Sequence, residues 1–308
     1  MITCLAGGVG AARLLRGIVA VHDPADVTAV VNTGDDLVLH GLAISPDLDT
    51  ITYTLAGAIS AERGWGLEGE TWHAMEALAR YGGQTWFGLG DKDLATHLYR
   101  TQRRAEGATL TEVTAEIVRA WDLVLRLLPM TDDDVRTRVT LAADAGGGEI
   151  GFQEYFVGQR HSVPVESVRF AGAEAAAPGP DVLRSIAEAE RVVICPSNPI
   201  VSIGPLLAVP GVADAVRSRR DDVVAVSPII AGAALKGPAD RLLTELGHES
   251  SVVGVARIYA ELCGTLVIDE ADADLAGAVE AEGVRAVVAP TIMKGADEAA
   301  ALAKVVLS

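Results

Sequence analysis

The sequence predicts an α/β fold: a Rossmann-like, doubly wound and mainly parallel sheet with an inserted helical and β-hairpin subdomain. Three observations support this prediction. Apolar runs of strand length alternate with Ala- and Leu-rich segments of helical character, the first run ends in a glycine turn, and the middle of the chain changes to helices joined by Gly-rich turns. At 308 residues the chain has room for one large domain or two smaller ones.

The first predicted unit is a strand, a glycine turn and a helix. Ile2 to Leu5 is an apolar run ending in glycines, and Ala11 to Val21 has apolar residues at helical spacing. Further strands are predicted at Asp26 to Val31, Arg191 to Cys195, Asp222 to Val226 and Val284 to Val288. Because helical segments separate these runs, we expect a parallel sheet covered on both faces.

The middle of the chain predicts the insertion. Helices are expected at Glu70 to Tyr81, Lys92 to Arg104 and Leu110 to Trp121. A hairpin of Val135 to Leu141 and Ile150 to Val157 should lead into Val165 to Phe170, and Gly172 to Pro180 should return the chain to the sheet. We therefore expect a nucleotide-binding core of residues 1–58 and 172–308. Residues 59–171 should form an inserted helical and hairpin subdomain that contributes to the binding site of a second substrate.

Composition narrows the classes of partner. A net charge of −17 and a pI near 4.7 argue against a nucleic-acid or anionic-membrane surface, because the long-range field repels polyanions. Three scattered cysteines argue against a disulfide framework, and dispersed histidines give little support for zinc or iron. No stretch has the roughly 18 to 20 apolar residues of a membrane helix. We expect a soluble cytoplasmic protein.

Four carboxylates are concentrated in one short polar stretch. Asn32-Thr33-Gly34-Asp35-Asp36 follows a strand of buried type, and Ser45-Pro46-Asp47-Leu48-Asp49-Thr50 comes a few residues later. Such a cluster suits a divalent cation that holds phosphates.

The glycine turn just upstream offers an anion site. After Gly8 and Gly10, the third glycine position of a dinucleotide fingerprint is occupied by Arg13, and the ribose-binding acid expected at the end of the second strand is missing. What remains is a set of backbone amides at a helix N-terminus, a generic anion site. The alternative is a tight turn that merely requires glycine.

Two later loops should emerge at the same carboxyl edge of the sheet, where ligands of open α/β sheets bind. Cys195 to Gly204 carries two hydroxyls and a carboxamide suited to phosphate, although Ser197 and Asn198 could instead cap the next helix. In Ser227 to Asp240, Lys236 could neutralise a phosphate and Asp240 could accept guanine protons, unless both form surface salt bridges.

Aromatic residues of the insertion predict a site for a flat heterocycle. Trp86 to His97 places aromatics beside a glycine-rich turn with three charges, and Trp65 and Trp72 precede it. Tryptophans are nonetheless often plain core residues, so this alternative stays open.

Together these strings resemble the transferase family of coenzyme F420 biosynthesis, named 2-phospho-L-lactate transferase and, in actinobacterial members, phosphoenolpyruvate transferase. The resemblance spans nearly the entire chain. It rests on GGVGAAR at Gly7 to Arg13, NTGDD at Asn32 to Asp36, SPDLDT at Ser45 to Thr50, GWGLEGETW at Gly64 to Trp72, WFGLGDKDLATH at Trp86 to His97, LLPMTDD at Leu127 to Asp133, FQEYFV at Phe152 to Val157, PSNPIVSIGP at Pro196 to Pro205 and SPIIAGAALKGPAD at Ser227 to Asp240.

The resemblance implies a reaction. Members of the family move a phospho-acyl unit from a guanosine diphosphate derivative of lactate or enolpyruvate onto the terminal ribityl hydroxyl of the deazaflavin Fo, and GMP is released. Magnesium is the implied cofactor, and a homodimer is the implied assembly. The actinobacterial style of GWGLEGETW and LLPMTDD favours enolpyruvate by analogy alone.

The resemblance also implies roles for individual residues. Asp49, Lys92 and Trp86 would contact Fo, although the family most often has arginine where this chain has Lys92. Asp35, Asp36 and Asp49 would divide metal coordination, with Asp36 and Asp49 as ligands, and activation of the Fo hydroxyl. Which of them is a base stays open, since an aspartate near magnesium keeps a low pKa. The nucleotide portion would contact Gly7, Gly8, Gly10, Arg13, Asn32, Thr33, Ser197, Asn198, Ser202, Gly204 and Lys236.

Two other classes of function compete with this one. Gluconeogenesis-factor proteins are related non-enzymatic regulators that bind nucleotide sugars, but the SPDLDT and GDKDLATH strings favour the transferase because a regulator needs no Fo pocket. A nicotinamide-dependent oxidoreductase is disfavoured by Arg13 in the fingerprint and by the absent ribose-binding acid.

Overall fold

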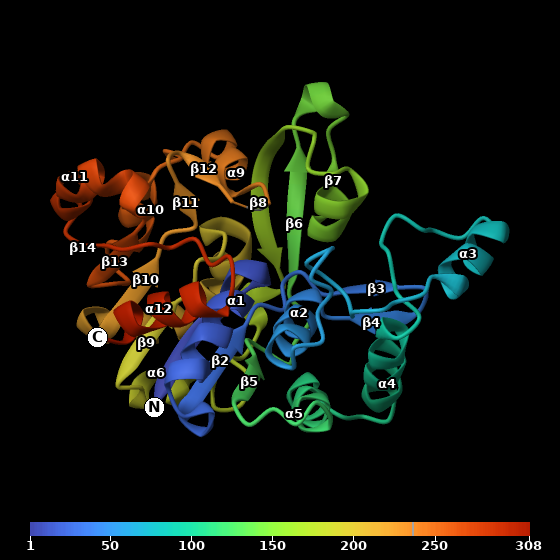
Figure 1. Cartoon of the computed structure of the whole chain (residues 1–308). Coiled ribbons are helices and arrows are strands. Elements are labelled where there is room, and N and C mark those ends of the chain that lie inside the picture. The colour runs from blue at the N-terminus through green and yellow to red at the C-terminus, as the bar shows by residue number, and fades with distance from the viewer. Residues whose placement is uncertain (236) are drawn as a thin grey trace.

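The computed structural model describes residues 1–235 and 237–308. Within these ranges the chain forms a seven-stranded sheet in the order β14-β13-β10-β9-β1-β2-β5, and every neighbouring pair is parallel (Figure 1). The strands are β1 (Ile2–Ala6), β2 (Val27–Val31), β5 (Arg126–Pro129), β9 (Arg191–Ile194), β10 (Val223–Val226), β13 (Thr265–Ile268) and β14 (Arg285–Val288). The predicted α/β fold with a parallel sheet is confirmed.

The order of the strands creates a ligand crevice at the centre of the sheet. From β1 the chain adds β2 and β5 on one side, and β9, β10, β13 and β14 follow on the other. The direction of winding therefore reverses between β1 and β9. In an open α/β sheet, loops that leave the carboxyl ends of strands at such a reversal diverge and leave room for a ligand.

Helices cover both faces because successive strand residues point to opposite sides. Leu5 and Val30 contribute to the core on one face, whereas Cys4 and Ala29 contribute to the core on the other. The Cys4 face carries α1 (Gly8–Val21), α2 (Pro46–Leu55), α5 (Leu110–Ala120) and α12 (Ala296–Leu307). The opposite face carries α6 (Val182–Glu188), α7 (Gly204–Ala208), α8 (Val212–Arg217), α9 (Ala239–Glu245), α10 (Val252–Tyr259) and α11 (Ala276–Ala281).

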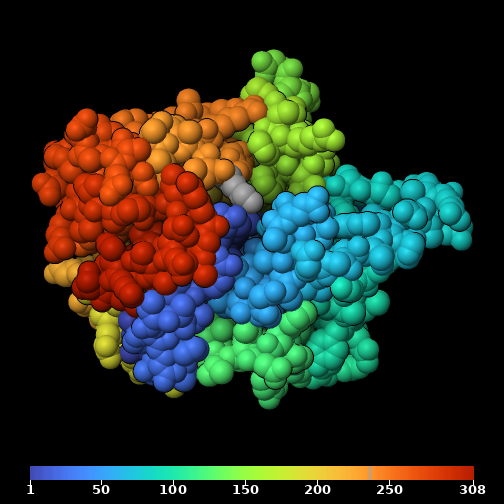
Figure 2. Space-filling view, in the orientation of Figure 1, coloured from blue at the N-terminus to red at the C-terminus, as the bar shows by residue number. Residues whose placement is uncertain are grey.

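Smaller elements surround the mouth of the crevice. The described residues include an antiparallel sheet of β6 (Arg136–Leu141), β7 (Glu149–Gly151) and β8 (Val165–Ala171), and short antiparallel pairs of β3 (Leu37–Leu39) with β4 (Leu42–Ile44) and of β11 (Ile229–Ile230) with β12 (Ala233–Ala234). The helix α4 (Asp93–Ala105) packs against β4, whereas α3 (His73–Arg80) lies beyond the ends of β3 and β4 (Figure 1). The segment around α3 forms an arm that projects from the body (Figure 2).

The structure corrects two details of the predicted insertion. The second hairpin strand ends at Gly151, and Glu154–Gly158 is helical. Residues 126–129, placed within the insertion, form β5 and pair with β2 at the edge of the central sheet. The predicted division into residues 1–58 with 172–308 and residues 59–171 therefore assigns one strand of the central sheet to the insertion. No helix among the described residues is long and apolar enough to cross a membrane.

Candidate active site

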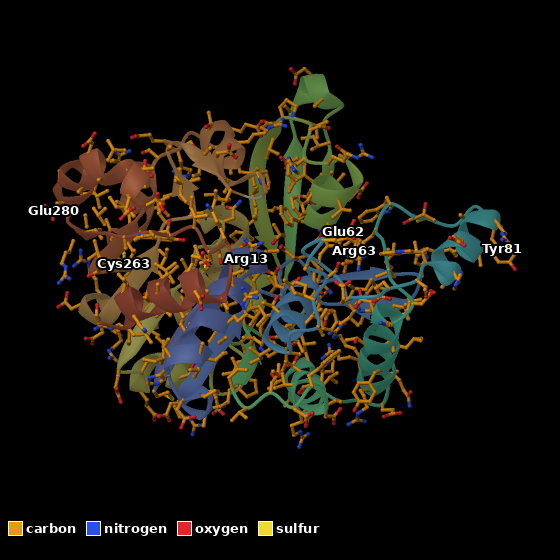
Figure 3. All side chains as sticks on the ribbon, in the orientation of Figure 1. Arg13, Glu62, Arg63, Tyr81, Cys263 and Glu280 are labelled. Carbon is orange, nitrogen blue, oxygen red and sulfur yellow. The ribbon has the colours of Figure 1, made fainter. Side chains whose placement is uncertain are left out.

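A cavity of about 800 Å³ opens where the loops after β1, β2, β9 and β10 meet the inserted elements. Figure 3 labels Arg13, on α1, and Arg63, between α2 and α3; both line this cavity, whereas Tyr81 lies at the tip of the arm. Loops from several strand ends thus converge at the crevice predicted by the strand order.

The glycine turn is the tight connection between β1 and α1. Helix α1 already begins at Gly8, with Gly7 at its N-cap and no side-chain cap. A side chain at Gly10 would collide with the carbonyl oxygen of Pro196, so only glycine allows this approach to the loop after β9. The Ser197 hydroxyl donates to the Gly7 carbonyl (2.8 Å) and accepts from the Gly7 amide (3.3 Å). The two loops predicted to bind phosphate are therefore bound to each other.

The loop after β9 is shaped by its own side chains. Asn198 caps the helical turn Pro199–Ile203 by accepting from the Ile200 amide (2.9 Å) and the Val201 amide (3.4 Å). The capping role considered for Asn198 is thus observed, and its side chain still lines the cavity beside Ser202. A side chain at Gly204 would crowd Phe170, so that glycine serves packing.

The loop after β2 gathers the carboxylates. Asn32 Nδ2 donates to Asp47 Oδ2 (3.0 Å), and Asn32 Oδ1 accepts from the Gly34 amide (2.9 Å), so Asn32 joins the two acidic strings. Ser45 Oγ donates to Asp36 Oδ2 (2.7 Å). Asp35 and Asp47 line the cavity.

Crowding and burial of these carboxylates shift their pKa values upward. Burial raises the pKa of Asp47 to about 6 and that of Asp36 to about 7. Burial, and then the neighbouring charge of Asp47, raise the pKa of Asp35 well above its ordinary value. The hydrogen bond from Asn32 acts in the opposite direction on Asp47. The cluster is therefore under electrostatic strain that a cation would relieve.

Asp49, which also lines the cavity, has a different environment. Arg100 Nη2 donates to Asp49 Oδ1, and Arg100 Nη1 donates to Asp49 Oδ2 (3.1 Å). Both carboxylate oxygens are thus held by one buried guanidinium, and Arg100 is only 1% exposed. No sequence pattern had identified Arg100, which lies one turn of α4 beyond the GDKDLATH string.

Aromatic residues form the wall opposite the sheet. The tryptophans Trp65 and Trp86 line the cavity together with Phe87, Phe152 and Phe156. The Arg63 guanidinium lies 5.6 Å from the ring centre of Trp65 and 5.4 Å from that of Trp72, which fixes this part of the wall through cation–π contacts.

The structure brings most of the predicted residues together. The cavity is lined by Gly7, Gly8, Gly10, Arg13, Asp35, Asp49, Trp86, Ser197, Asn198 and Ser202. The predicted residues Asn32, Thr33, Asp36, Lys92 and Gly204 are outside the lining formed by the described part of the chain. Lys92 Nζ instead donates to the Glu68 carbonyl (2.8 Å). Lys236 lies outside the described residues.

Several lining residues were not assigned roles from the sequence. Asp47, Asp93 and His97 lie within the motifs SPDLDT and GDKDLATH, but a motif does not show which of its residues face the cavity. Tyr53 also lines the cavity, and no sequence pattern had predicted a role for it. Asp240, considered for guanine, lies in the first turn of α9, where its neighbour Ala239 rather than Asp240 lines the cavity.

The carboxylates predicted to bind magnesium differ in how well their surroundings suit the ion. Asp35 Oδ1 and Asp36 Oδ1 are buried without a hydrogen-bond partner in the structure, as expected of hard oxygen ligands for a divalent cation. Asp49 has a different environment, because Arg100 donates to both of its oxygens. Within residues 1–235 and 237–308, no three His, Cys, Asp or Glu side chains form a closed metal site. Magnesium is commonly held by one or two carboxylates together with substrate phosphates, so an open pair of this kind suits it.

Comparison with solved structures supports the fold. A member of the UPF0052 family from Bacillus halodurans is similar over 100% of this chain and 98% of its own, with a TM-score of 0.63 and 16% identity. At that identity the likeness concerns the fold alone.

Comparison of sequences identifies the family. Phosphoenolpyruvate transferase from Streptomyces coelicolor is 46% identical over 309 residues, covering 100% of this chain and 97% of the relative. Phosphoenolpyruvate transferase from Thermobifida fusca is 46% identical, and the match covers 98% of this chain and 95% of the relative. The protein of the same name from Mycobacterium avium is 45% identical, and the match covers 87% of this chain and 86% of the relative. The family model described as 2-phospho-L-lactate transferase CofD matches residues 2–294. The predicted resemblance is confirmed: the chain belongs to the 2-phospho-L-lactate transferase CofD family and is a transferase enzyme.

Proposed function

We propose that this enzyme transfers a phosphoenolpyruvyl group from its guanosine diphosphate derivative to the terminal ribityl hydroxyl of the deazaflavin Fo and releases GMP, in coenzyme F420 biosynthesis. One observation carries the proposal: a single cavity joins an uncapped helix N-terminus and a strained carboxylate cluster to an aromatic wall. The first two features suit a metal-bound diphosphate, and the third suits a flat heterocycle.

The donor would lie on the sheet side of the cavity. The first backbone N–H groups of a helix have no intrahelical partner, and α1 has no side-chain cap to satisfy them. Val9 and Gly10, in that first turn, line the cavity beside Arg13. These groups suit phosphate oxygens. The name of the relatives supports phosphoenolpyruvate over 2-phospho-L-lactate as the transferred unit.

A diphosphate beside this helix would also lie beside Asp35 and Asp47, and uncompensated anions repel strongly at a buried site. We propose that Asp35 and Asp36 hold Mg²⁺ there, because each has an oxygen without a partner in the structure. When bound, the ion would neutralise charge on the phosphate oxygens.

The acceptor would lie on the aromatic side. Trp65, Trp86 and Phe156 offer ring faces and edges to a deazaflavin, and Gln153 adds a polar group. Asp49 and Asp93 line the cavity and can accept a hydrogen bond from a ribityl hydroxyl. The chain would thus align the hydroxyl with the phosphorus and exclude water, and positioning of this kind accounts for much of phosphoryl-transfer catalysis.

The direct test is a mass-spectrometric assay of the purified protein with Fo, Mg²⁺ and each guanylylated acid. We expect the enolpyruvyl donor to give the phospho-acyl deazaflavin and GMP. Asp35→Asn should reduce the rate on the order of 100-fold, as for loss of one preorganised electrostatic group. Asp214→Asn, which alters an exposed ion pair with Arg217 away from the cavity, should leave the rate within twofold of wild type.

The outcomes separate the candidate functions. Turnover of only the 2-phospho-L-lactyl donor would change the assigned substrate and keep the reaction class. If neither donor reacts while a nucleotide sugar raises the Tm, the proposal fails and a binding protein of the gluconeogenesis-factor type replaces it.

A further inference from the structure

Arg100 is a charged side chain buried beneath the cavity rather than in it. It comes from α4, is 1% exposed, and is absent from the cavity lining that the described residues form. Its Nη1 also lies 3.3 Å from the Ala43 carbonyl oxygen, so the guanidinium links α4 to β4 as well as to Asp49 on α2. Although burial acts in the opposite direction, Asp49 raises the pKa of Arg100, and the guanidinium is therefore charged.

His97 completes this arrangement from the preceding turn of α4. Its Nδ1 lies 3.3 Å from Arg100 Nη1. Since a guanidinium nitrogen can only donate, His97 Nδ1 must accept, and in the neutral imidazole the proton is then on Nε2. Nε2 lies 3.3 Å from Asp93 Oδ2, a close polar contact whose alignment is not that of a hydrogen bond.

Asp93 is anchored in turn. The Tyr53 hydroxyl donates to Asp93 Oδ1 (2.6 Å) and lies 2.8 Å from Thr96 Oγ1. The neighbouring His97 and the hydrogen bond from Tyr53 hold the pKa of Asp93 below its usual range although burial acts in the opposite direction. Close polar contacts therefore connect Tyr53 through Asp93, His97 and Arg100 to Asp49, and we name these five residues the Asp49 network.

The network contains charges that are costly to bury. Removing one ion from water costs several kcal/mol, and a well-formed buried pair does little more than offset that cost. Stability alone is therefore a weak reason for the network. Four of its members, Tyr53, Asp93, His97 and Asp49, line the cavity, so its effect reaches the ligand.

Charge pairing also restricts what Asp49 can do. Both oxygens of the Asp49 carboxylate accept hydrogen bonds from the guanidinium, which fixes the orientation of the carboxylate. Each oxygen retains a further lone pair, so the carboxylate can still accept a hydrogen bond from a hydroxyl of a ligand.

We propose that Arg100, oriented by His97, is a positioning residue that fixes Asp49 as a charge-paired hydrogen-bond acceptor for a ribityl hydroxyl of the deazaflavin acceptor. This inference rests on the proposed function. The contact between Asp49 and the acceptor is the one that the family resemblance implied, and the inference adds Arg100 and His97 as the residues that hold the carboxylate in place.

Arg100→Lys tests the inference because it keeps the positive charge and removes the two-pronged contact. The matched control is Arg103→Lys on the same helix, where a two-pronged contact with Glu116 at 2.9 and 3.0 Å lies away from the cavity.

Fo binding is measured by the fluorescence of Fo without donor or metal, and KM for the donor is measured separately. We expect Arg100→Lys to weaken Fo binding about 10-fold, the equivalent of one charge-assisted hydrogen bond, and to change KM for the donor less than twofold. Arg103→Lys should change neither value.

A second variant covers the case in which Arg100→Lys does not fold. Asp49→Asn combined with Arg100→Gln leaves no unpaired buried charge at these two positions, so the double variant should fold. It should bind Fo at least 10-fold more weakly than wild type, because the amide pair does not fix the acceptor in the same way.

Wild-type affinity for Fo in folded Arg100→Lys, or in the double variant, would overturn the inference and leave the proposed function intact. Equal losses of Fo affinity and donor affinity would also overturn it, because they indicate a general structural role. If the wild-type protein itself does not bind Fo, the proposed function fails, and this inference fails with it.

Discussion

Gly10 shows how one residue can determine the shape of the site. Its Cα lies so close to the Pro196 carbonyl that a β-carbon has no room. The same contact places the uncapped end of α1 beside the loop after β9, and Ser197 reinforces it from the other side. The glycine is thus required by close approach rather than by its φ angle.

We expect Gly10→Ala to weaken binding of guanosine diphosphate at least 10-fold, because the two loops must move apart by about 1 Å at their closest contact. Isothermal titration calorimetry would measure the affinity. Gly277→Ala is the control, since a β-carbon added at this position of α11 would have no other atom within 4 Å. That variant should bind normally and gain about 0.5–1 kcal/mol in stability from better helix propensity. Normal binding by Gly10→Ala would show that the contact is dispensable.

At the level of elements, two helices use their N-termini in opposite ways. Helix α1 has no side-chain cap and opens onto the cavity. Helix α5 has a complete capping box: Thr109 Oγ1 accepts from the Glu112 amide (3.1 Å), and Glu112 Oε2 accepts from the Thr109 amide (2.8 Å). The first pattern leaves N–H groups for a ligand, whereas the second stabilises the helix alone.

Thr109→Ala should therefore lower the free energy of unfolding by about 1 kcal/mol without changing kcat. Urea denaturation followed by circular dichroism provides the measurement. Thr111→Ala removes a hydroxyl of the same helix that has no hydrogen-bond partner in the structure, and we expect a change within about 0.5 kcal/mol. Equal effects of the two substitutions would contradict a capping role for Thr109.

For the whole molecule, the buried carboxylates link folding to pH and to cations. The pKa of Asp36 is raised to about 7 and that of Asp47 to about 6, and that of Asp35 is raised well above its ordinary value. Between pH 4 and pH 7 the folded state retains protons that the unfolded chain has already lost. Their contribution to stability is complete below pH 4 and is lost as the pH rises through the folded-state values.

We accordingly expect the Tm to fall between pH 5 and pH 8, apart from effects of other groups, and millimolar Mg²⁺ to restore part of the loss at pH 8. Asp36→Asn should raise stability at pH 8 by a few kcal/mol at most, since each pKa unit is worth about 1.4 kcal/mol. It should also reduce the response to Mg²⁺. Differential scanning fluorimetry across pH, with and without Mg²⁺, measures both effects. A Tm that is independent of Mg²⁺ in the wild type at pH 8 would contradict a cation site at this cluster.

The sequence by itself determined the class of fold and the identity of the loops that form the site. Most residues of β1, β2, β9 and β10 lie between two covered faces and are therefore apolar, which made these strands recognisable. The apolar run of β14 was recognisable as well, although this strand lies at the sheet edge and is partly exposed. Gly7 to Arg13, Asn32 to Asp36 and Ser197 to Gly204 stood out because turns, caps and carboxylate clusters depend on neighbours close in sequence.

Only the tertiary structure decided which members of those strings reach the cavity and what each one contacts. Arg100 and Asp49 are 51 residues apart in the chain, and Gly10 and Pro196 are further apart still in sequence although they follow neighbouring strands, so no local pattern could pair them. The strand β5 was missed for a similar reason, since its four residues become a strand only by pairing with β2 at the sheet edge. Local interactions specify the elements of this protein, whereas packing between distant segments pairs Asp49 with a buried arginine.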